Sequence, residues 1–484
     1  MGEDMIVLVE TKDGIESEKY VCLSYCWGKS STSITTTVAS YGERTSKIVE
    51  SSLPKTYKDA ILITRALGLR YLWIDALCIV QDDSEDWVQQ SSQMHQIYAS
   101  SHITIGASTG RGSDSGILND RIPTTHTIKS AVPTVDEGLS VVVYTQTAAQ
   151  YMESHHSQFY VWSAQVDEPL ANRAWAFQER FLSTRIVHFT ATEMVMECKA
   201  GIRCECSDLE SRHPNQTLKR FFMGTQENKE HDNRFGTPDL FYEWTWIIQH
   251  YTSLVLTYQT DILPALSGLA RAFREKQREE DDNDLGHYHA GLWETHFPHC
   301  LAWYAAAGSS RCEPYLAPSW SWASVKGQVR WQTPLSHRKF KLVIVRTVSV
   351  PLTSDQYGQL STGTMTARGQ IAPFPPEWLQ PPYHSPWDHP LKDRHGIGSY
   401  FVLSFDDEKL EHTAKDLFLL KLFIEDFQPG PTKPFRTRVT GLILTCCGKN
   451  TYRRVGYYAA GWELSDEYEN NKALLFVDEE ISLV

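Results

Sequence analysis

Two carboxylates stand in or beside an apolar segment near the start of the chain. Asp75 interrupts the apolar run YLWIDALCIV at 71–80, and Asp82 follows two residues after its end. A carboxylate inside an apolar segment costs free energy unless it is hydrogen-bonded or belongs to a site that uses its charge. We therefore predict that Asp75 and Asp82 are catalytic, with Asp75 as a general acid/base or a ribose-binding group. The structural alternative for Asp75 is an acceptor for backbone amides of the turn at 27–29.

A third carboxylate, Glu179, lies near two arginines in the segment RAWAFQER. Arg173 precedes it, Arg180 follows it, and the aromatic residues between them indicate burial. A buried charge needs a partner. Two interpretations stay open: an internal salt-bridge network that joins domains, or a substrate pocket in which Glu179 is catalytic and Arg180 binds the substrate.

The other candidate residues are polar or aromatic and stand where strands are predicted to end. A parallel sheet binds ligands at the carboxyl ends of its strands, so side chains at these points are candidates for substrate binding. They are Ser24, Tyr25, Trp27, Gln81, Asp86, Trp87 and Gln90.

Alternating strands and helices are predicted to position these residues. Strands are expected within 19–30, at 71–80 and at 102–105, and helices at 54–67 and after the acidic cluster at 82–86. The run at 71–80 is typical of a strand buried on both faces, and acidic residues favour a helix start. The order is that of a doubly wound α/β fold. We expect Ser24, Asp75 and Asp82 to surround one hollow at the carboxyl edge of its sheet.

The chain has 484 residues, which is enough for two or three domains. We predict an α/β core over 1–110, a middle region over 111–330 that is mainly helical in its second half, and an antiparallel β domain over 331–484, either a sandwich or barrel-like. Helical patterns in the middle region include 242–273 and 287–305. The segment PSWSWAS is expected to be extended and to bury Trp320 and Trp322.

Composition excludes several classes of function. The formal net charge of -13 argues against nucleic acid as a partner, because such binding neutralises phosphate charge. We find neither a secretory signal nor an apolar run of the roughly 20 residues that cross a bilayer, so a cytoplasmic protein without a membrane partner is expected. The cysteines are expected to be thiols, and neither a metal nor a resident cofactor is predicted.

Several consecutive motifs resemble one family. They are LSYCWG at 23–28, LPKTYKDAI at 53–61, YLWIDALCIVQDD at 71–83 and MHQIYASSHITIGAS at 94–108. Together with NRAWAFQERFLSTRIVHF at 172–189 and APSWSWASVKG at 317–327, they are similar to the fungal heterokaryon incompatibility (HET) family. That family is regarded as distantly similar to Toll/interleukin-receptor (TIR) domains. The resemblance implies a TIR-like, flavodoxin-like core, self-association through it, and a role in non-self recognition and cell death.

The resemblance also makes NAD a candidate substrate. Some TIR domains cleave NAD with a glutamate on a helix, a few residues after a tryptophan. In this chain Trp87 is followed by VQQSS, and Gln90 stands where many HET domains carry glutamate. An amide neither carries the negative charge nor accepts the proton that this chemistry requires. Cleavage of NAD or NADP by that route is therefore not expected.

Three functions stay open from the sequence. The first is HET-type signalling, with or without nucleotide cleavage. The second is a secondary-metabolism enzyme, of the cyclase or isomerase type, that uses an aromatic-lined pocket. The third is a non-catalytic binding or scaffold protein. The first two need a small-molecule ligand or a nucleotide at the predicted sheet edge.

Overall fold

The computed structural model divides the chain into two units. The first comprises Met1–His231 with Arg271–Lys276, and the second Asp232–Ala270 with Gln277–Val484. The residues that the structure describes are 6–10, 18–28, 34–120, 125–129, 140–144, 168–191, 193–198, 200–205, 240–280, 284–332, 338–376, 391–392, 398–407, 416–427, 436–463 and 475–484.

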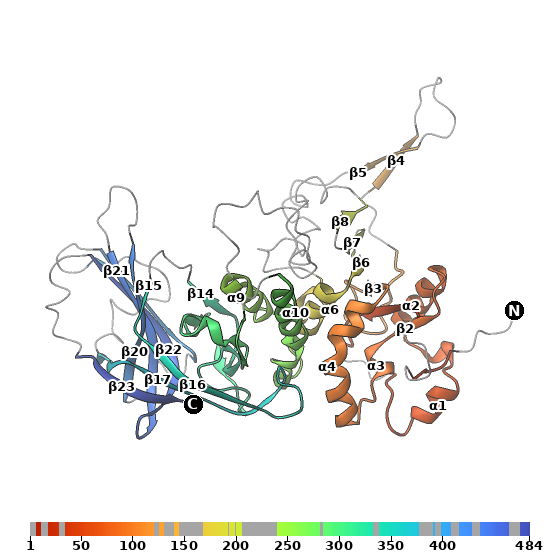
Figure 1. Ribbon diagram of the computed structural model, residues 1–484. Coiled ribbons are helices and arrows are strands. Elements are labelled where there is room, and N and C mark those ends of the chain that lie inside the picture. The colour runs from red at the N-terminus through yellow and green to blue at the C-terminus, as the bar shows by residue number, and fades with distance from the viewer. Residues whose placement is uncertain are drawn as a thin grey trace. The chain divides into compact units, whose positions relative to one another are not determined.

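A six-stranded sheet with the order β2-β1-β3-β6-β7-β8 forms the centre of the first unit (Figure 1). Its strands are β1 (Tyr20–Ser24), β2 (Tyr71–Trp73), β3 (Ile103–Gly106), β6 (Arg185–Phe189), β7 (Met194–Cys198) and β8 (Gly201–Cys204). The first four in this order pair in parallel, and β7 and β8 continue the sheet antiparallel. The prediction of mixed α/β content, with an N-terminal sheet that contains parallel strands, is confirmed.

Helices pack against both faces of β1, because successive side chains of a strand point to opposite sides. Val21 and Leu23 share a buried cluster with Tyr57 of α2 (Lys55–Ala66). On the other face, the Tyr20 hydroxyl and the Cys22 thiol donate hydrogen bonds to the carbonyl oxygen of Ile97 in α4 (Ser84–Ser100). Helix α6 (Ala174–Leu182) packs against α4 and β1. Ser24 continues the face of Tyr20 and Cys22, which directs its side chain toward α4 and α6.

The predicted strand at 71–80 is wrong in its length and in its burial. Strand β2 ends at Trp73 and its residues are only partly buried, while residues Asp75–Cys78 form the one-turn helix α3. The amides of Leu77 and Cys78 both donate to the carbonyl oxygen of Ile74. A short apolar run does not distinguish a strand from a helical turn, so the packing of the rest of the unit decides between them. Asp75 therefore begins a helix and does not lie within a strand.

The acidic cluster starts a helix, as predicted. Asp83 is the N-cap of α4, and its side chain accepts hydrogen bonds from the amides of Glu85 and Asp86. These carboxylates lie at the positive end of the helix dipole, where negative charge is stabilising. The remaining elements of the first unit are α1 (Tyr41–Ser46), β4 (Thr125–Lys129), β5 (Ser140–Tyr144) and short 3-10 turns at Glu50–Ser52 and Leu170–Asn172.

Two helices match the helical pattern at 242–273. They are α9 (Leu240–Tyr251) and α10 (Pro264–Glu280). The helix predicted at 287–305 is wrong, since that segment forms short strands and 3-10 turns: β9 (Tyr288–His289), β10 (Leu292–Trp293), turns at Glu294–His296 and His299–Leu301, and β11 (Trp303–Ala305). Gly291 has a φ of +92° and Pro298 lacks an amide hydrogen, so neither suits a continuous helix.

The rest of that region is irregular, and residues 317–325 within it are buried. Its elements are β12 (Ser310–Arg311), a 3-10 turn at Trp322–Ser324, β13 (Val325–Lys326) and β14 (Val329–Trp331). Trp320 and Trp322 are both fully buried, as predicted for PSWSWAS. The predicted extended conformation is wrong, because Trp322–Ser324 form a 3-10 turn. The predicted middle region is therefore helical only up to α10.

A nine-stranded sheet follows, and its pairings close on themselves. Strands β17, β20, β21, β22 and β23 form a ring in which each pairs with the next, mostly antiparallel. The sheet consists of β15 (Arg338–Phe340), β16 (Val343–Pro351), β17 (Leu360–Pro373), β18 (Leu391–Lys392), β19 (Gly398–Phe405), β20 (Leu417–Phe427), β21 (Arg436–Gly448), β22 (Thr451–Glu463) and β23 (Val477–Leu483). A β-rich C-terminal region is confirmed.

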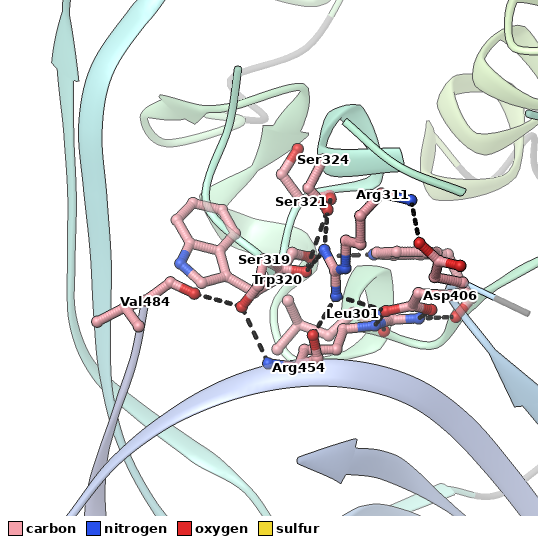
Figure 2. Close-up of polar contacts among 11 residues, drawn as sticks. Leu301, Arg311, Ser319, Trp320, Ser321, Ser324, Asp406, Arg454 and Val484 are labelled. Carbon is pink, nitrogen blue, oxygen red and sulfur yellow. Dashed lines mark hydrogen bonds and ion pairs between the residues drawn. The ribbon is translucent and has the colours of Figure 1, made fainter. Parts of the chain in front are cut away.

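Two arginines and one aspartate connect residues 287–331, the irregular segment, to this sheet. Figure 2 shows Arg454 of β22 and Arg311 of β12 converging on Asp406, which follows β19. The Nε–Oδ2 distance from Arg454 is 3.1 Å, and the Nη2–Oδ2 distance from Arg311 is 2.9 Å. Arg454 also donates to the carbonyl oxygens of Leu301 and Trp303 at 2.7 and 2.5 Å. Arg454 and Asp406 are fully buried, so their charges are stabilised by one another and by these carbonyls.

Candidate functional site

Ser24 and Glu179 form the centre of a polar cluster at the carboxyl end of β1. Ser24 is the last residue of that strand, and its Oγ donates to Glu179 Oε2 of α6 at 2.5 Å. Both side chains are buried, with 2% and 6% of their surface exposed. The pairing follows from the local fold, because Ser24 faces α6 and Glu179 lies on the side of that helix next to β1.

The environment of Glu179 raises its carboxyl pKa to about 7. Burial is the main cause, and the negative charge of Asp75 acts in the same direction. The hydroxyls of Ser24 and Tyr98 and the positive charge of Arg173 oppose the rise in pKa. A carboxyl group that titrates near neutral pH is suited to both donating and accepting a proton.

Asp75 is the first residue of α3, just after the neighbouring strand β2 ends at Trp73. Its Oδ2 accepts a hydrogen bond from Trp27 Nε1 at 2.7 Å, and its Oδ1 accepts one from the Ala76 amide at 2.6 Å. Gln81 Nε2 donates to the Asp75 carbonyl oxygen at 3.1 Å. Burial raises the Asp75 pKa, while the bonds from Trp27 and Ala76 and the charge of Arg173 lower it. The partner in the 27–29 turn is thus the Trp27 indole.

Tyr25 and Arg173 connect the two carboxyl groups. Arg173 Nη1 donates to the Tyr25 carbonyl oxygen at 2.9 Å, and its charge acts on both Asp75 and Glu179. The Tyr25 hydroxyl lies 2.6 Å from that of Tyr57 in α2. The cluster is therefore formed by the end of β1, the start of α3 and the helices α2, α4 and α6.

Four of the predicted site residues lie at the start of α4. Asp82 is exposed, and its Oδ1 accepts a hydrogen bond from the Val38 amide at 2.8 Å. Asp86 accepts from the Val80 amide at 2.8 Å and from Gln90 Nε2 at 3.1 Å, and Trp87 is the next residue of the helix. The structure thus brings Ser24, Asp75 and Glu179 together. Asp82 lies apart from them and contacts the loop at Val38.

Arg180 belongs to a different group of charges. Its Nε and Nη2 donate to the Glu197 carboxylate of β7 at 2.8 and 3.3 Å, and His188 Nε2 lies 3.4 Å from the same carboxylate. Glu197 is fully buried, so this ion pair neutralises it inside the first unit. Consecutive helix residues point in different directions, which explains why Glu179 and Arg180 have different partners.

The sequence did not identify Tyr98 and Tyr57 as members of the cluster. Both fit the apolar pattern of a helix, and both are buried in the way that this pattern predicts. The apolar pattern does not predict the hydrogen bonds of their hydroxyl groups, although a buried tyrosine hydroxyl usually has a hydrogen-bond partner. The Tyr98 hydroxyl donates to the Leu23 carbonyl oxygen at 3.2 Å, next to Ser24.

Gly28 holds the turn after Trp27, and we predict that Gly28→Ala disturbs the cluster. Gly28 has a φ of +77°, and an added Cβ would lie 2.7 Å from the Gly112 Cα. Because backbone cannot move aside easily, we expect a loss of about 1–3 kcal/mol in the unfolding free energy of the first unit. Urea unfolding, with hydrogen exchange of β1 peptides as the probe, measures this loss in unfolding free energy. Gly42→Ala is the control, since Gly42 is in α1 with open space around it; equal effects of the two changes would contradict the prediction.

Comparison with known families assigns the first part of the chain. Residues 20–179 match the model of the heterokaryon incompatibility protein (HET) family. This part of the chain is a HET domain. The match begins at β1 and ends at Glu179, so it includes Ser24, Asp75 and Glu179. The resemblance predicted from the motifs is confirmed over this span.

Comparison with curated proteins and with solved structures gives no match to the chain. Among the described residues, no helix has both the length and the apolar character to cross a membrane. Within the same ranges, no three His, Cys, Asp or Glu side chains are grouped so as to hold a metal ion.

Proposed function

We propose that this chain is a HET-family protein of fungal non-self recognition and cell-death signalling. The observation that carries the proposal is the buried Ser24–Glu179 pair beside Asp75, at the carboxyl edge of a parallel sheet and inside the HET span. Open α/β sheets bind ligands at this edge. The ligand in the proposal is a small molecule or nucleotide, recognised in the cytoplasm.

The TIR-like, flavodoxin-like character of the core is part of this proposal. The parallel strands follow the order β2-β1-β3-β6, with helices packed on both faces of β1. A flavodoxin-like sheet has this second-first-third-fourth order, and its ligand site lies beside the first strand. Ser24 ends that first strand, which supports ligand binding there. Self-association through this domain is the expected means of signalling.

The chemistry that we propose runs through Glu179 and not through Gln90. The Gln90 amide is hydrogen-bonded to Asp86 at the start of α4, and it carries no charge. Glu179 has a carboxyl pKa of about 7 and a hydroxyl partner, and Asp75 provides a second carboxylate. This pair is suited to general acid/base catalysis on a hydroxyl-bearing ligand, for which NAD is the first substrate to test.

Expression of the chain in a fungal host tests the signalling proposal. We expect wild-type chain to cause growth arrest or cell death, and Glu179→Gln to abolish it. Glu43→Gln is the matched control, because Glu43 is an exposed carboxylate on α1 outside the cluster. Normal growth with the wild-type chain present would overturn the proposal.

Incubation of purified chain with NAD tests the catalytic part separately. We expect nicotinamide release to fall about 100-fold or more in Glu179→Gln, the scale of one acid/base group, and to be unchanged in Glu43→Gln. NAD left intact, together with a bound metabolite-sized ligand, would overturn this part in favour of the secondary-metabolism enzyme.

A further inference from the structure

Two adjacent cysteines, Cys446 and Cys447, lie exposed near the end of β21. The other described cysteines are buried or partly buried, which limits the access of reagents to their thiols. Cys446 Sγ lies 3.2 Å from the Gly448 carbonyl oxygen, and Cys447 Sγ lies 3.8 Å from that of Thr445. Both contacts are with carbonyls of the same strand, and both cysteines are exposed to solvent.

A β-bulge at this point changes the geometry of the pair. Cys446 is opposite Tyr452 of β22 and Gly448 is opposite Thr451, so two steps along β21 match one step along β22. Cys447 is the extra residue of this bulge. In a regular strand, neighbouring side chains point to opposite faces and their sulfurs are far apart. A bulge redirects a side chain and leaves its residue without a ladder partner, which permits the peptide between the cysteines to rotate.

We propose that Cys446 and Cys447 form a vicinal dithiol site that hydroperoxides oxidise to an intramolecular disulfide. One thiolate attacks the O–O bond, which breaks to leave a sulfenic acid on that sulfur and to release water or an alcohol. The second thiolate then attacks the same sulfur, an S–S bond forms, and the hydroxyl leaves as water. Two thiols lose two electrons and two protons, and the peroxide is reduced by two electrons.

The resulting disulfide is easily reduced, which makes the modification reversible. Neighbouring Cα atoms are about 3.8 Å apart, below the usual range of about 4.4–6.8 Å for a disulfide. A disulfide outside that range is strained and has a more oxidising potential. Formation of the disulfide also fixes the conformation of the bulge opposite Tyr452. At Tyr452, β22 pairs with β23, and the Tyr452 carbonyl oxygen accepts a hydrogen bond from the Val484 amide. Oxidation thus acts next to the β22–β23 pairing, which is one of the pairings that close the ring of strands.

Peptide mass spectrometry of the full chain tests the proposal. Cleavage after Arg438 and Lys449 releases residues 439–449, which contain these two cysteines and no other. After hydrogen peroxide treatment and alkylation, we expect this peptide to carry no alkyl group and to be lighter by two hydrogen atoms than the reduced form. Alkylation of both cysteines, separate over-oxidation of each, or a cross-link between two chains would overturn the proposal.

A second probe measures the geometry without oxidation. Phenylarsine oxide binds tightly where two thiols reach one arsenic atom, so we expect one equivalent bound per chain. Cys447→Ser removes the second anchor and is expected to weaken binding about 100-fold or more. Cys312→Ser is the control, because burial raises the Cys312 pKa to about 11 and keeps its thiol protonated. Equal binding by wild-type chain and Cys447→Ser would contradict the site.

Discussion

Asp406→Asn is expected to lower the unfolding free energy of the second unit by about 3–5 kcal/mol. The change keeps the size of the side chain and removes its charge, so the guanidinium groups of Arg311 and Arg454 lose their common counter-ion. Arg454 is fully buried, and the Arg311 side chain is 16% exposed. Removing one partner of a buried ion pair costs this much because the remaining charge stays in a medium of low dielectric constant.

The position of these charges explains why the effect extends beyond one contact. Arg454 belongs to the strand ring, and its donors bind the carbonyl oxygens of Leu301 and Trp303 in the irregular segment. The Arg454 guanidinium also lies 3.2 Å from the centre of the Trp303 ring, a favourable cation–π contact. Asp406 holds Arg454 in this orientation with two oxygens. Its loss is expected to loosen the irregular segment from the sheet.

Urea unfolding of the full chain, with hydrogen exchange of the peptides from 299–324, measures the loss. The neighbouring Asp407→Asn is the matched control: Asp407 is partly exposed and accepts a hydrogen bond from the Arg311 amide at 3.1 Å, so a change of about 1 kcal/mol or less is expected. Arg311→Met in the Asp406→Asn background removes one unpaired charge and should restore part of the stability. If Asp406→Asn behaves like Asp407→Asn, the cluster does not stabilise the fold.

The order of strands and helices in the HET domain was predictable because it depends on local signals. Pro54 and Gly68 bound α2, Asp83 caps α4, and the apolar strand at β1 ends at Ser24 as expected. These residues act on their own backbone or on the next few residues, so their effect is visible in the sequence. The edge at which Ser24 lies follows from that order alone, whereas Asp75 lies there because β2 ends at Trp73, which was not predicted.

Errors arose where a local pattern has two solutions. The run at 71–80 is apolar enough for a strand or for a helical turn, and tertiary packing selects α3 after Trp73. In 287–305 the aromatic spacing suggested a helix, while Gly291 with its positive φ and Pro298 prevented one. The backbone conformation at these two residues decides the structure there, and side-chain spacing does not.

The contacts that define the candidate site were not predictable in detail. Ser24 and Glu179 are separated by 155 positions, and their hydrogen bond depends on how α6 packs against β1. Whether Glu179 or Arg180 faces that strand depends on the rotation of α6, which a stretch with aromatic residues on several sides does not specify. Asp82 shows the converse, since it is close to Asp75 in sequence and has its hydrogen-bond partner at Val38.

Glu179→Gln is expected to remove a pH dependence from the stability of the first unit. The folded-state pKa of about 7 lies above the ordinary value of 4.5, so the folded state holds this proton more tightly than the unfolded state does. The stabilisation by protonated Glu179 is therefore complete below about pH 4.5 and is lost as pH rises through about 7. The size of the loss is about 3 kcal/mol.

Glutamine resembles the protonated carboxyl group and does not titrate, and its amide oxygen is able to accept the Ser24 hydrogen bond. At pH 8 we therefore expect the variant to be more stable than the wild-type chain by up to about 3 kcal/mol, and at pH 4.5 we expect the two to be nearly equal. Asp75, whose pKa is also raised by burial, is present in both proteins, so most of its contribution cancels in the comparison.

Urea midpoints at pH 4.5, 6 and 8, with hydrogen exchange of the 174–182 peptide as the local probe, measure this difference. Glu43→Gln changes an exposed carboxylate on α1 and should follow the wild-type curve at every pH. Parallel curves for the wild-type chain and Glu179→Gln would show that Glu179 keeps an ordinary pKa. If Glu179 is a functional group, Glu179→Gln is expected to gain stability at neutral pH and to lose activity. A buried titrating carboxyl lowers the stability of the fold, and it is retained because of the proton that it transfers.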